Sequence, residues 1–155
     1  MIKIIAALLL ISTSCFSQEK VVNPFQLNIK YSTLVSSIKI RLTKDKIDIL
    51  NFRNKDSVVF SQNIKYSDTL QMISEMDVSK LNDYYSNACI DDGISLAIYY
   101  TRNKLSKTII LDNYYQNDIG EVVEYVNSLI PRKYKIWYDK NALISEYEKC
   151  NIKSQ

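Results

Sequence analysis

The sequence predicts an α+β fold: a mainly antiparallel sheet, built from N-terminal strands and a central hairpin, with helices packed on it. Residues 25–49 alternate apolar and polar side chains with the period of two that strands require. Residues 94–111 form a second alternating segment with the pattern of a hairpin. Apolar residues recur at helical spacing between and after these segments. Strands and helices that come in separate runs indicate an α+β architecture.

Four strands are expected in the first part of the chain. Alternation runs from Phe25 to Tyr31 and continues over 38–42 and 46–49. A tight turn at Lys44-Asp45 gives a register with apolar pairs on one face and an opposite-charge pair on the other: Leu42 with Ile47, Ile40 with Ile49, and Arg41 with Asp48. The alternation changes phase after Ile49, which predicts a bulge or a strand end. Residues 53–56 are typical of a turn, and 58–64 of a fourth strand.

Two short helices are expected next. Asp68 with Gln71 three positions later has the form of a capping box. Asp77 is expected to cap a second helix, whose apolar face carries Val78, Leu81 and Tyr85. An Asp92-Gly93 turn then leads into the hairpin.

The hairpin comprises strands at 94–100 and 105–111 around a turn at Asn103-Lys104. This register places Ile98 opposite Ile109 and Leu96 opposite Leu111 on one face, Ala97 opposite Ile110 and Tyr99 opposite Thr108 on the other, and Ser95 opposite Asp112. Apolar residues on both faces predict strands in the centre of the sheet, covered at least partly on each side. The hairpin is therefore expected to organise the fold.

A long helix, a short strand and a terminal helix complete the prediction. Asp118 is expected to cap a helix that Pro131 ends after Ile130. Residues 134–138 are expected to form a strand, and a last helix with Leu143, Ile144 and Tyr147 to end near Cys150.

The N-terminus has the basic start, apolar run and small polar end of a secretory signal peptide. The apolar run, 4–11, extends only about 12 Å as a helix, too little to span a bilayer. We expect residues 1–17 to be a cleaved signal, 18–24 a flexible leader and 25–155 a single domain in a periplasmic or secreted protein. Lipidation of Cys15 is the alternative, although Ser12 replaces the aliphatic residue that a lipobox requires.

Export makes the cysteines informative. Cleavage after Ser17 leaves Cys89 and Cys150, an even pair in an oxidising compartment. We predict a disulfide between them, with two separately buried thiols as the alternative.

Composition excludes several functional classes. The chain has no histidine, which removes His-based nucleophile pairs and His-ligated zinc. Two glycines are too few for a Gly-rich nucleotide loop. The net charge of +3 is spread along the chain and forms no basic stripe for nucleic acid. We therefore expect a non-catalytic protein without cofactor, bound metal or nucleic-acid partner, and no transmembrane segment in the mature chain.

Two candidate sites remain. The hairpin ends bring Asp91, Asp92 and Asp112 into one neighbourhood, where carboxylates suit calcium or the acid and base of a glycosidase. Turns also use Asp for local hydrogen bonds, so the cluster need not be functional. Asn113, Tyr114 and Tyr115 form a candidate contact surface for a protein or a glycan, because tyrosine combines apolar area with a polar tip. The alternative is that these tyrosines fill the edges of the core.

Three functional hypotheses follow. The first is a protein-binding or inhibitor/immunity-type module outside the cytoplasm. The second is a carboxylate-based glycan hydrolase or a calcium-dependent glycan-binding domain. The third is a structural component of the envelope. The motifs CIDDG at 89–93, NYY at 113–115 and LIPRKY at 129–134 resemble those of small uncharacterised exported proteins of Bacteroidetes. That resemblance covers less than half of the chain and implies export without a particular activity.

Overall fold

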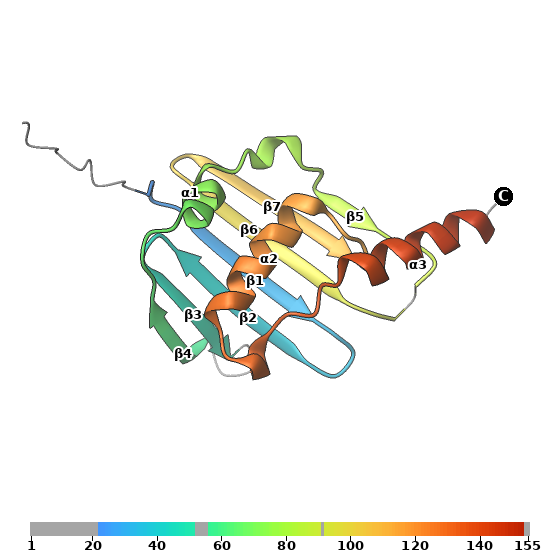
Figure 1. Cartoon of the computed structure of the whole chain (residues 1–155), viewed down its shortest axis with the longest axis horizontal. Helices are drawn as coiled ribbons and strands as arrows, with labels where there is room; N and C mark the ends of the chain where they lie inside the picture. Colours follow the sequence, from blue (N-terminus) through green and yellow to red (C-terminus); the bar gives the residue numbers. More distant parts are fainter. Residues whose placement is uncertain (1–21, 52–55, 91, 154–155) are drawn as a thin grey trace, which may run out of the picture.

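The computed structural model describes residues 22–51, 56–90 and 92–153, with side chains up to residue 150. Strands and helices follow one another in the order shown in Figure 1. Their bounds are β1 (Gln26–Ser32), β2 (Ser37–Thr43), β3 (Lys46–Asn51), β4 (Ser57–Asn63), α1 (Asp68–Glu75), η1 (Val78–Lys80), β5 (Tyr84–Ser86), β6 (Ser95–Arg102), β7 (Leu105–Asp112), α2 (Asn117–Leu129), η2 (Arg132–Tyr134) and α3 (Lys140–Lys153), where η denotes a 3₁₀ turn. The predicted α+β class is confirmed. The predicted signal peptide, Cys15, most of the 53–56 turn and Asp91 lie outside the described residues.

In this part of the chain, seven strands form one sheet in the order β4-β3-β2-β1-β6-β7-β5. All neighbours are antiparallel except β5, which runs parallel to β7. Both predicted hairpin registers are confirmed, including Arg41 opposite Asp48 and Ser95 opposite Asp112. The predicted irregularity after Ile49 is a register shift between β3 and β4. The hairpin β6–β7 lies in the interior of the sheet, between the middle strand β1 and the edge strand β5 (Figure 1).

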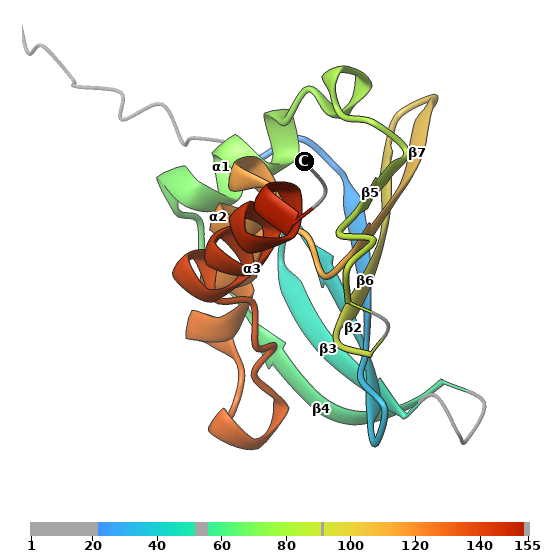
Figure 2. The same cartoon turned by 90° about the vertical axis from the view of Figure 1, so that its right-hand side faces the viewer.

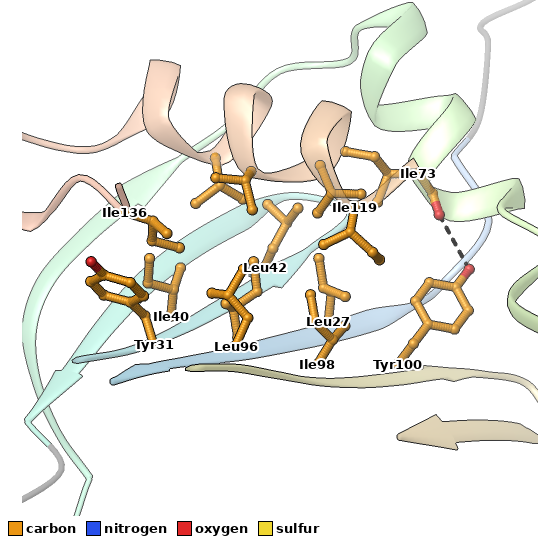
Figure 3. Packing of buried hydrophobic residues seen from close by; sticks show 14 of the residues in the cluster. Leu27, Tyr31, Ile40, Leu42, Ile73, Leu96, Ile98, Tyr100, Ile119 and Ile136 are labelled. Carbon is orange, nitrogen blue, oxygen red and sulfur yellow. Dashed lines mark hydrogen bonds between the residues drawn. The ribbon is translucent and has the colours of Figure 1, made fainter. Parts of the chain in front are cut away.

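The helices lie on one side of the sheet (Figure 2). The apolar half of each alternating strand faces them and forms the core, in which Leu27, Ile40 and Ile98 are fully buried (Figure 3). Helix α2 contributes Ile119, Val122, Val123 and Val126 to this core. Within the described residues, no helix lies on the second face of the hairpin, so the cover expected there is not found.

The capping residues of α1 and α2 lie one and two positions before the predicted ones. Ser67, not Asp68, caps α1 by accepting a hydrogen bond from the Leu70 N–H at 3.1 Å. Gln116, not Asp118, caps α2 through its side-chain oxygen, which is 2.7 Å from the Ile119 N–H. Helix α2 ends at Leu129, one residue before the predicted end at Ile130, and Pro131 follows as expected.

Two predicted elements are wrong. The second short helix is only the 3₁₀ turn η1, and Tyr85 lies in β5, where pairing with β7 satisfies backbone groups that a helix would otherwise use. Residues 134–138 form no strand. Instead, the Asn127 side chain takes the place of a neighbouring strand, since its amide donates to the Ile136 carbonyl and accepts from the Ile136 N–H, both at 2.8 Å.

The packed region begins before Phe25. Val22, which falls within the predicted leader, is only 7% exposed and belongs to the core. Within the described residues, no helix is both long enough and apolar enough to cross a membrane.

Candidate functional site

The face of the sheet opposite the helices carries the polar half of the alternating strands, and we call it the open face. Side chains of successive strand residues point to opposite faces, so the residues between the buried ones lie here. They include Gln26, Asn28 and Lys30 on β1, Lys39 and Arg41 on β2, and Ala97 and Tyr99 on β6. Tyr99 keeps 42% of its surface exposed. The open face thus combines cations, amides and an aromatic ring.

A hollow of about 520 Å³ on the open face is bordered by three cations. We call it the basic hollow, and its lining consists of Gln26, Asn28, Lys30, Lys39, Arg41, Leu50, Asp56 and Tyr99. Leu50 is buried and supplies an apolar floor. Among the described residues of the lining, one carboxylate stands against three cations. The hollow therefore favours an anionic ligand.

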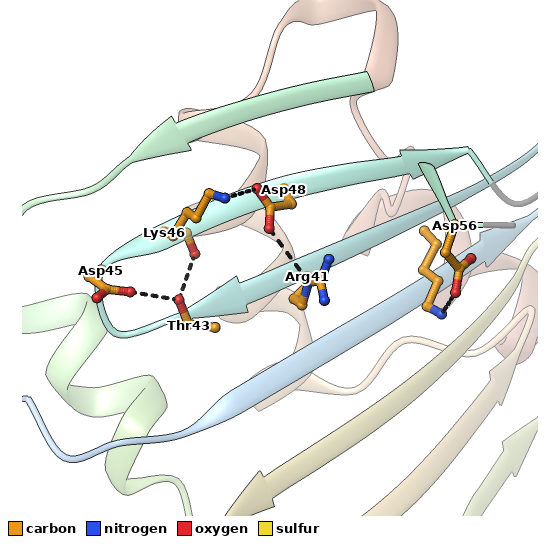
Figure 4. A network of polar contacts seen from close by, with 7 residues as sticks. Arg41, Thr43, Asp45, Lys46, Asp48 and Asp56 are labelled. Atoms are coloured by element: carbon orange, nitrogen blue, oxygen red, sulfur yellow. Dashed lines mark hydrogen bonds and ion pairs between the residues drawn. The ribbon is translucent and has the colours of Figure 1, made fainter. Parts of the chain in front are cut away.

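Ion pairs hold the long side chains around the basic hollow in place (Figure 4). Lys39 Nζ lies 2.6 Å from Asp56 Oδ2, and Arg41 Nε lies 3.5 Å from Asp48 Oδ2. Lys46 contacts the other oxygen of Asp48 at 3.1 Å. Burial alone would raise the pKa of the Asp48 carboxyl, but hydrogen bonds from Ser61 and Lys46 and the charges of Lys46 and Arg41 together lower it. Asp48 is therefore a carboxylate at neutral pH, and it positions Arg41.

A second hollow, of about 530 Å³, contains the described part of the predicted acidic cluster. Asp92 and Asp112 both line it, as predicted, while Asp91 lies outside the described residues. We call it the acidic hollow. It also contains the ring of Tyr84, which is 56% exposed, and the buried Asn87, whose Nδ2 has no hydrogen-bond partner in the described part of the chain.

No metal centre is found where side chains are described: no three Cys, Asp or Glu side chains lie close enough together to hold an ion. Because Asp91 is not among them, the calcium hypothesis at the acidic cluster stays a prediction.

Asn113 shapes the rim of the acidic hollow. Its backbone has a φ of 53°, and its side chain accepts from the Ile94 N–H at 2.8 Å and donates to the Ile90 carbonyl at 3.3 Å. Asn113 is only 8% exposed. The expected exposed contact at this residue is therefore wrong, because its amide is used to hold the loop before β6.

Tyr114 and Tyr115 are half-buried and pack on other tyrosines. The Tyr114 ring stacks on Tyr85 at 5.3 Å and meets the edge of Tyr147 at 5.2 Å. Tyr115 stacks on Tyr138 at 4.9 Å. These contacts join β5 and α3 to the loop between β7 and α2 and to the segment before α3, which agrees with the alternative interpretation that the two rings fill the edge of the core.

The Tyr138 hydroxyl secures the loop between β7 and α2. It donates to the Tyr114 carbonyl and accepts from the Gln116 N–H, both at 2.9 Å. Burial raises the pKa of Tyr138 well above its ordinary value. The Tyr138 hydroxyl is therefore neutral at neutral pH and joins the two backbone groups as donor and acceptor.

The predicted disulfide is confirmed. Cys89 and Cys150 are bonded, with their Cα atoms 5.7 Å apart. The bond ties the end of α3 to the loop that borders the acidic hollow.

Comparison with family models, with curated proteins and with solved structures finds no match for this chain. The candidate sites therefore follow from the geometry of the described residues. Sequence reasoning missed the basic hollow, although its signal was present in the polar partners of the strand alternation, Lys30, Lys39 and Arg41.

Proposed function

We propose that this protein is an exported, non-catalytic binding module that binds an acidic surface of a partner protein. One observation carries the proposal: the described helices all lie on one side of the sheet, and the other face holds a hollow with three cations and one carboxylate among its described lining residues. Charge complementarity of this kind steers association and selects partners.

The side chains around the basic hollow have the chemistry of a protein interface. Arginine binds carboxylates with a planar pair of donors, and its partner Asp48 already orients Arg41. Tyr99 beside it offers exposed apolar area with a polar tip, as tyrosines in interfaces do. An inhibitor or immunity protein that neutralises an exported enzyme needs only such a surface and no catalytic group.

Capture of partners by immobilised mature protein tests the proposal, with a charge reversal as the discriminating variant. Lys39→Glu reverses one cation of the hollow and leaves the Arg41–Asp48 pair intact. Lys133→Glu is the matched control, because Lys133 is exposed on η2, away from the open face. Periplasmic and secreted extracts serve as the source of partners.

We expect the wild type and Lys133→Glu to retain the same protein, and Lys39→Glu to retain at least about tenfold less. Poly-L-glutamate and added salt should release it, since both compete for the cations. A partner that Lys39→Glu holds as well as the wild type does, or the absence of any retained partner at micromolar bait, would refute the proposal.

A glycan-binding site is the second candidate, and the acidic hollow favours it. Tyr84 offers an exposed ring, while Asp92, Asp112 and the unpartnered Nδ2 of Asn87 supply acceptors and a donor for hydroxyl groups. An array of neutral oligosaccharides probed with wild type and Tyr84→Ala tests it. Binding that the variant loses would support this candidate, and an array without signal would remove it.

A further inference from the structure

We infer that the open face also binds a second copy of this chain, in a twofold dimer that sets the basic hollow of each protomer on the acidic hollow of the other. Both hollows lie on the same face. Ser32 and Lys30 are on the same side of β1, and Ser95 and Tyr99 are on the same side of β6. The inference does not depend on the proposed function.

The two hollows carry opposite charges. The described lining of the basic hollow has three cations and one carboxylate. That of the acidic hollow has two carboxylates, Asp92 and Asp112, and no cation among the residues described. A surface with two opposite poles is complementary to its own copy, which a surface of uniform charge cannot be.

The spacing of the strands keeps the two poles electrostatically separate. Lys39 lies on β2 and Asp112 on β7, which are three strand positions apart in the sheet. Neighbouring strands are about 4.8 Å apart, so Lys39 and Asp112 are roughly 14 Å apart across the sheet, and Lys30 on β1 is roughly 10 Å from Asp112. Both separations exceed the Debye length of about 8 Å at physiological ionic strength. An approaching copy therefore experiences a dipolar face.

A twofold axis satisfies both poles at once. The axis lies between the two facing sheets, perpendicular to the line that joins the two hollows of one protomer. Rotation about it places Lys39 near Asp112 of the partner subunit, and Asp112 near the partner subunit's Lys39. Interfaces of this isologous kind repeat every contact twice, so one favourable charge pair counts double.

The strand registers show which side chains lie between the poles. Lys39 pairs with Lys30, Lys30 with Ala97, and Ala97 with Ile110, so Lys30 and Ala97 lie between Lys39 and β7. Ser32 and Ser95 lie in the row of Asp112, and Tyr99 lies on the far side of the Lys39 row. The apolar area near the axis therefore comes from Ala97 and Ile110, which are half-buried.

Sedimentation equilibrium of the mature protein tests the dimer. We expect the average mass to rise towards that of a dimer as the concentration increases from micromolar to about 1 mM in about 20 mM NaCl. In about 500 mM NaCl the dissociation constant should rise at least tenfold, because salt screens both poles. A protein that stays monomeric over this range at low salt, or a dimer that is insensitive to salt, would overturn the inference.

A charge swap tests the pairing itself. Lys39→Glu and Asp112→Lys should each be monomeric, because each homodimer would contain two like-charge contacts. Their equimolar mixture should form a heterodimer, since both of its contacts then join opposite charges. Lys133→Glu should dimerise like the wild type, and Asp92→Lys provides a second acidic-side variant should Asp112→Lys not fold. Variants that dimerise alone, or that fail to pair when mixed, would overturn the arrangement.

Discussion

Replacing Cys89 and Cys150 together with serine measures how much the disulfide stabilises the fold. The bond joins residues 61 positions apart. Closing a loop of that length removes conformational entropy from the unfolded chain, which the chain-entropy model values at about 4 kcal/mol at 25 °C. We expect the free energy of unfolding to fall by that amount. Both cysteines are replaced so that no free thiol remains to form intermolecular bonds.

Urea unfolding followed by circular dichroism is the assay. The serine variant should have a lower midpoint and a somewhat larger m-value, because an unlinked chain exposes more surface when it unfolds. If the free energy of unfolding falls by less than about 1 kcal/mol, the disulfide does not stabilise the fold by restricting the unfolded chain as the chain-entropy model requires.

Leu143→Ala in both backgrounds separates the unfolded state from the docking of α3. Leu143 is 1% exposed and anchors α3 in the core. Its truncation should cost about 2–4 kcal/mol with the disulfide present. If the bond acts on the unfolded chain, the cost should be the same without it. If Leu143→Ala costs nothing in the serine variant, then α3 has left the sheet and the entropic argument fails.

Three further predictions concern single contacts, each measured by urea unfolding. Gly93→Ala should lower the free energy of unfolding by about 2–3 kcal/mol, because a Cβ there would lie 1.8 Å from Asn113 Oδ1 and displace a side chain that holds two hydrogen bonds. Adding Asn113→Ala to this variant should then lower it little further, because those hydrogen bonds are already lost. Fully additive losses in the double variant would contradict this coupling. Asn127→Ala should cost about 2 kcal/mol by orphaning both backbone groups of Ile136, and a neutral effect would show that water replaces the amide. Burial raises the pKa of Tyr138 in the folded state above its unfolded value of about 10. The contribution of Tyr138 to the free energy of unfolding is therefore fully present below about pH 10 and is lost as the pH rises through the folded-state pKa. Tyr138→Phe should lose less stability between neutral and alkaline pH than the wild type, and equal losses would contradict this assignment.

The strand registers follow from the sequence because two independent patterns agree on them. The period of two fixes which residues face the core, and a shift by one would expose Leu42 and Ile40. The Arg41–Asp48 pair on the opposite face then selects the same alignment. Export, inferred from residues 1–17, made a bonded Cys89 and Cys150 the expected outcome.

The layers of the fold do not follow from the same patterns. Tyr99 and Ile110 suggested cover on the second face of the hairpin, yet they lie on the open face. Alternation shows that a strand has two chemically different faces, but not which helices exist to cover them. An apolar residue on an open face is common, because folded proteins expose much apolar area.

Side chains that replace backbone partners are also hidden from sequence patterns. Asn113 contacts Ile94, which is 19 positions earlier, and Asn127 contacts Ile136, nine positions later. Neither spacing belongs to a helix or a strand. Asn113 therefore looked like an exposed loop residue, and 134–138 like a strand. In both places an amide satisfies backbone groups that a ladder would otherwise pair.

The two poles of the open face are held by different means, and this affects what each can contribute to binding. Beside the acidic hollow, Ile94 is held by the Asn113 amide and Cys89 by its bond to Cys150, so these two residues are fixed before a ligand arrives. The basic hollow depends on lysine and arginine side chains, whose rotamers must be ordered on binding. Ordering of this kind costs about 0.5–1.5 kcal/mol for each side chain. The ion pairs Lys39–Asp56 and Arg41–Asp48 reduce that cost by restraining both cations beforehand. Asp56 and Asp48 therefore reduce the net positive charge of the basic hollow, but they also lower the entropic cost of ordering Lys39 and Arg41 when a ligand binds.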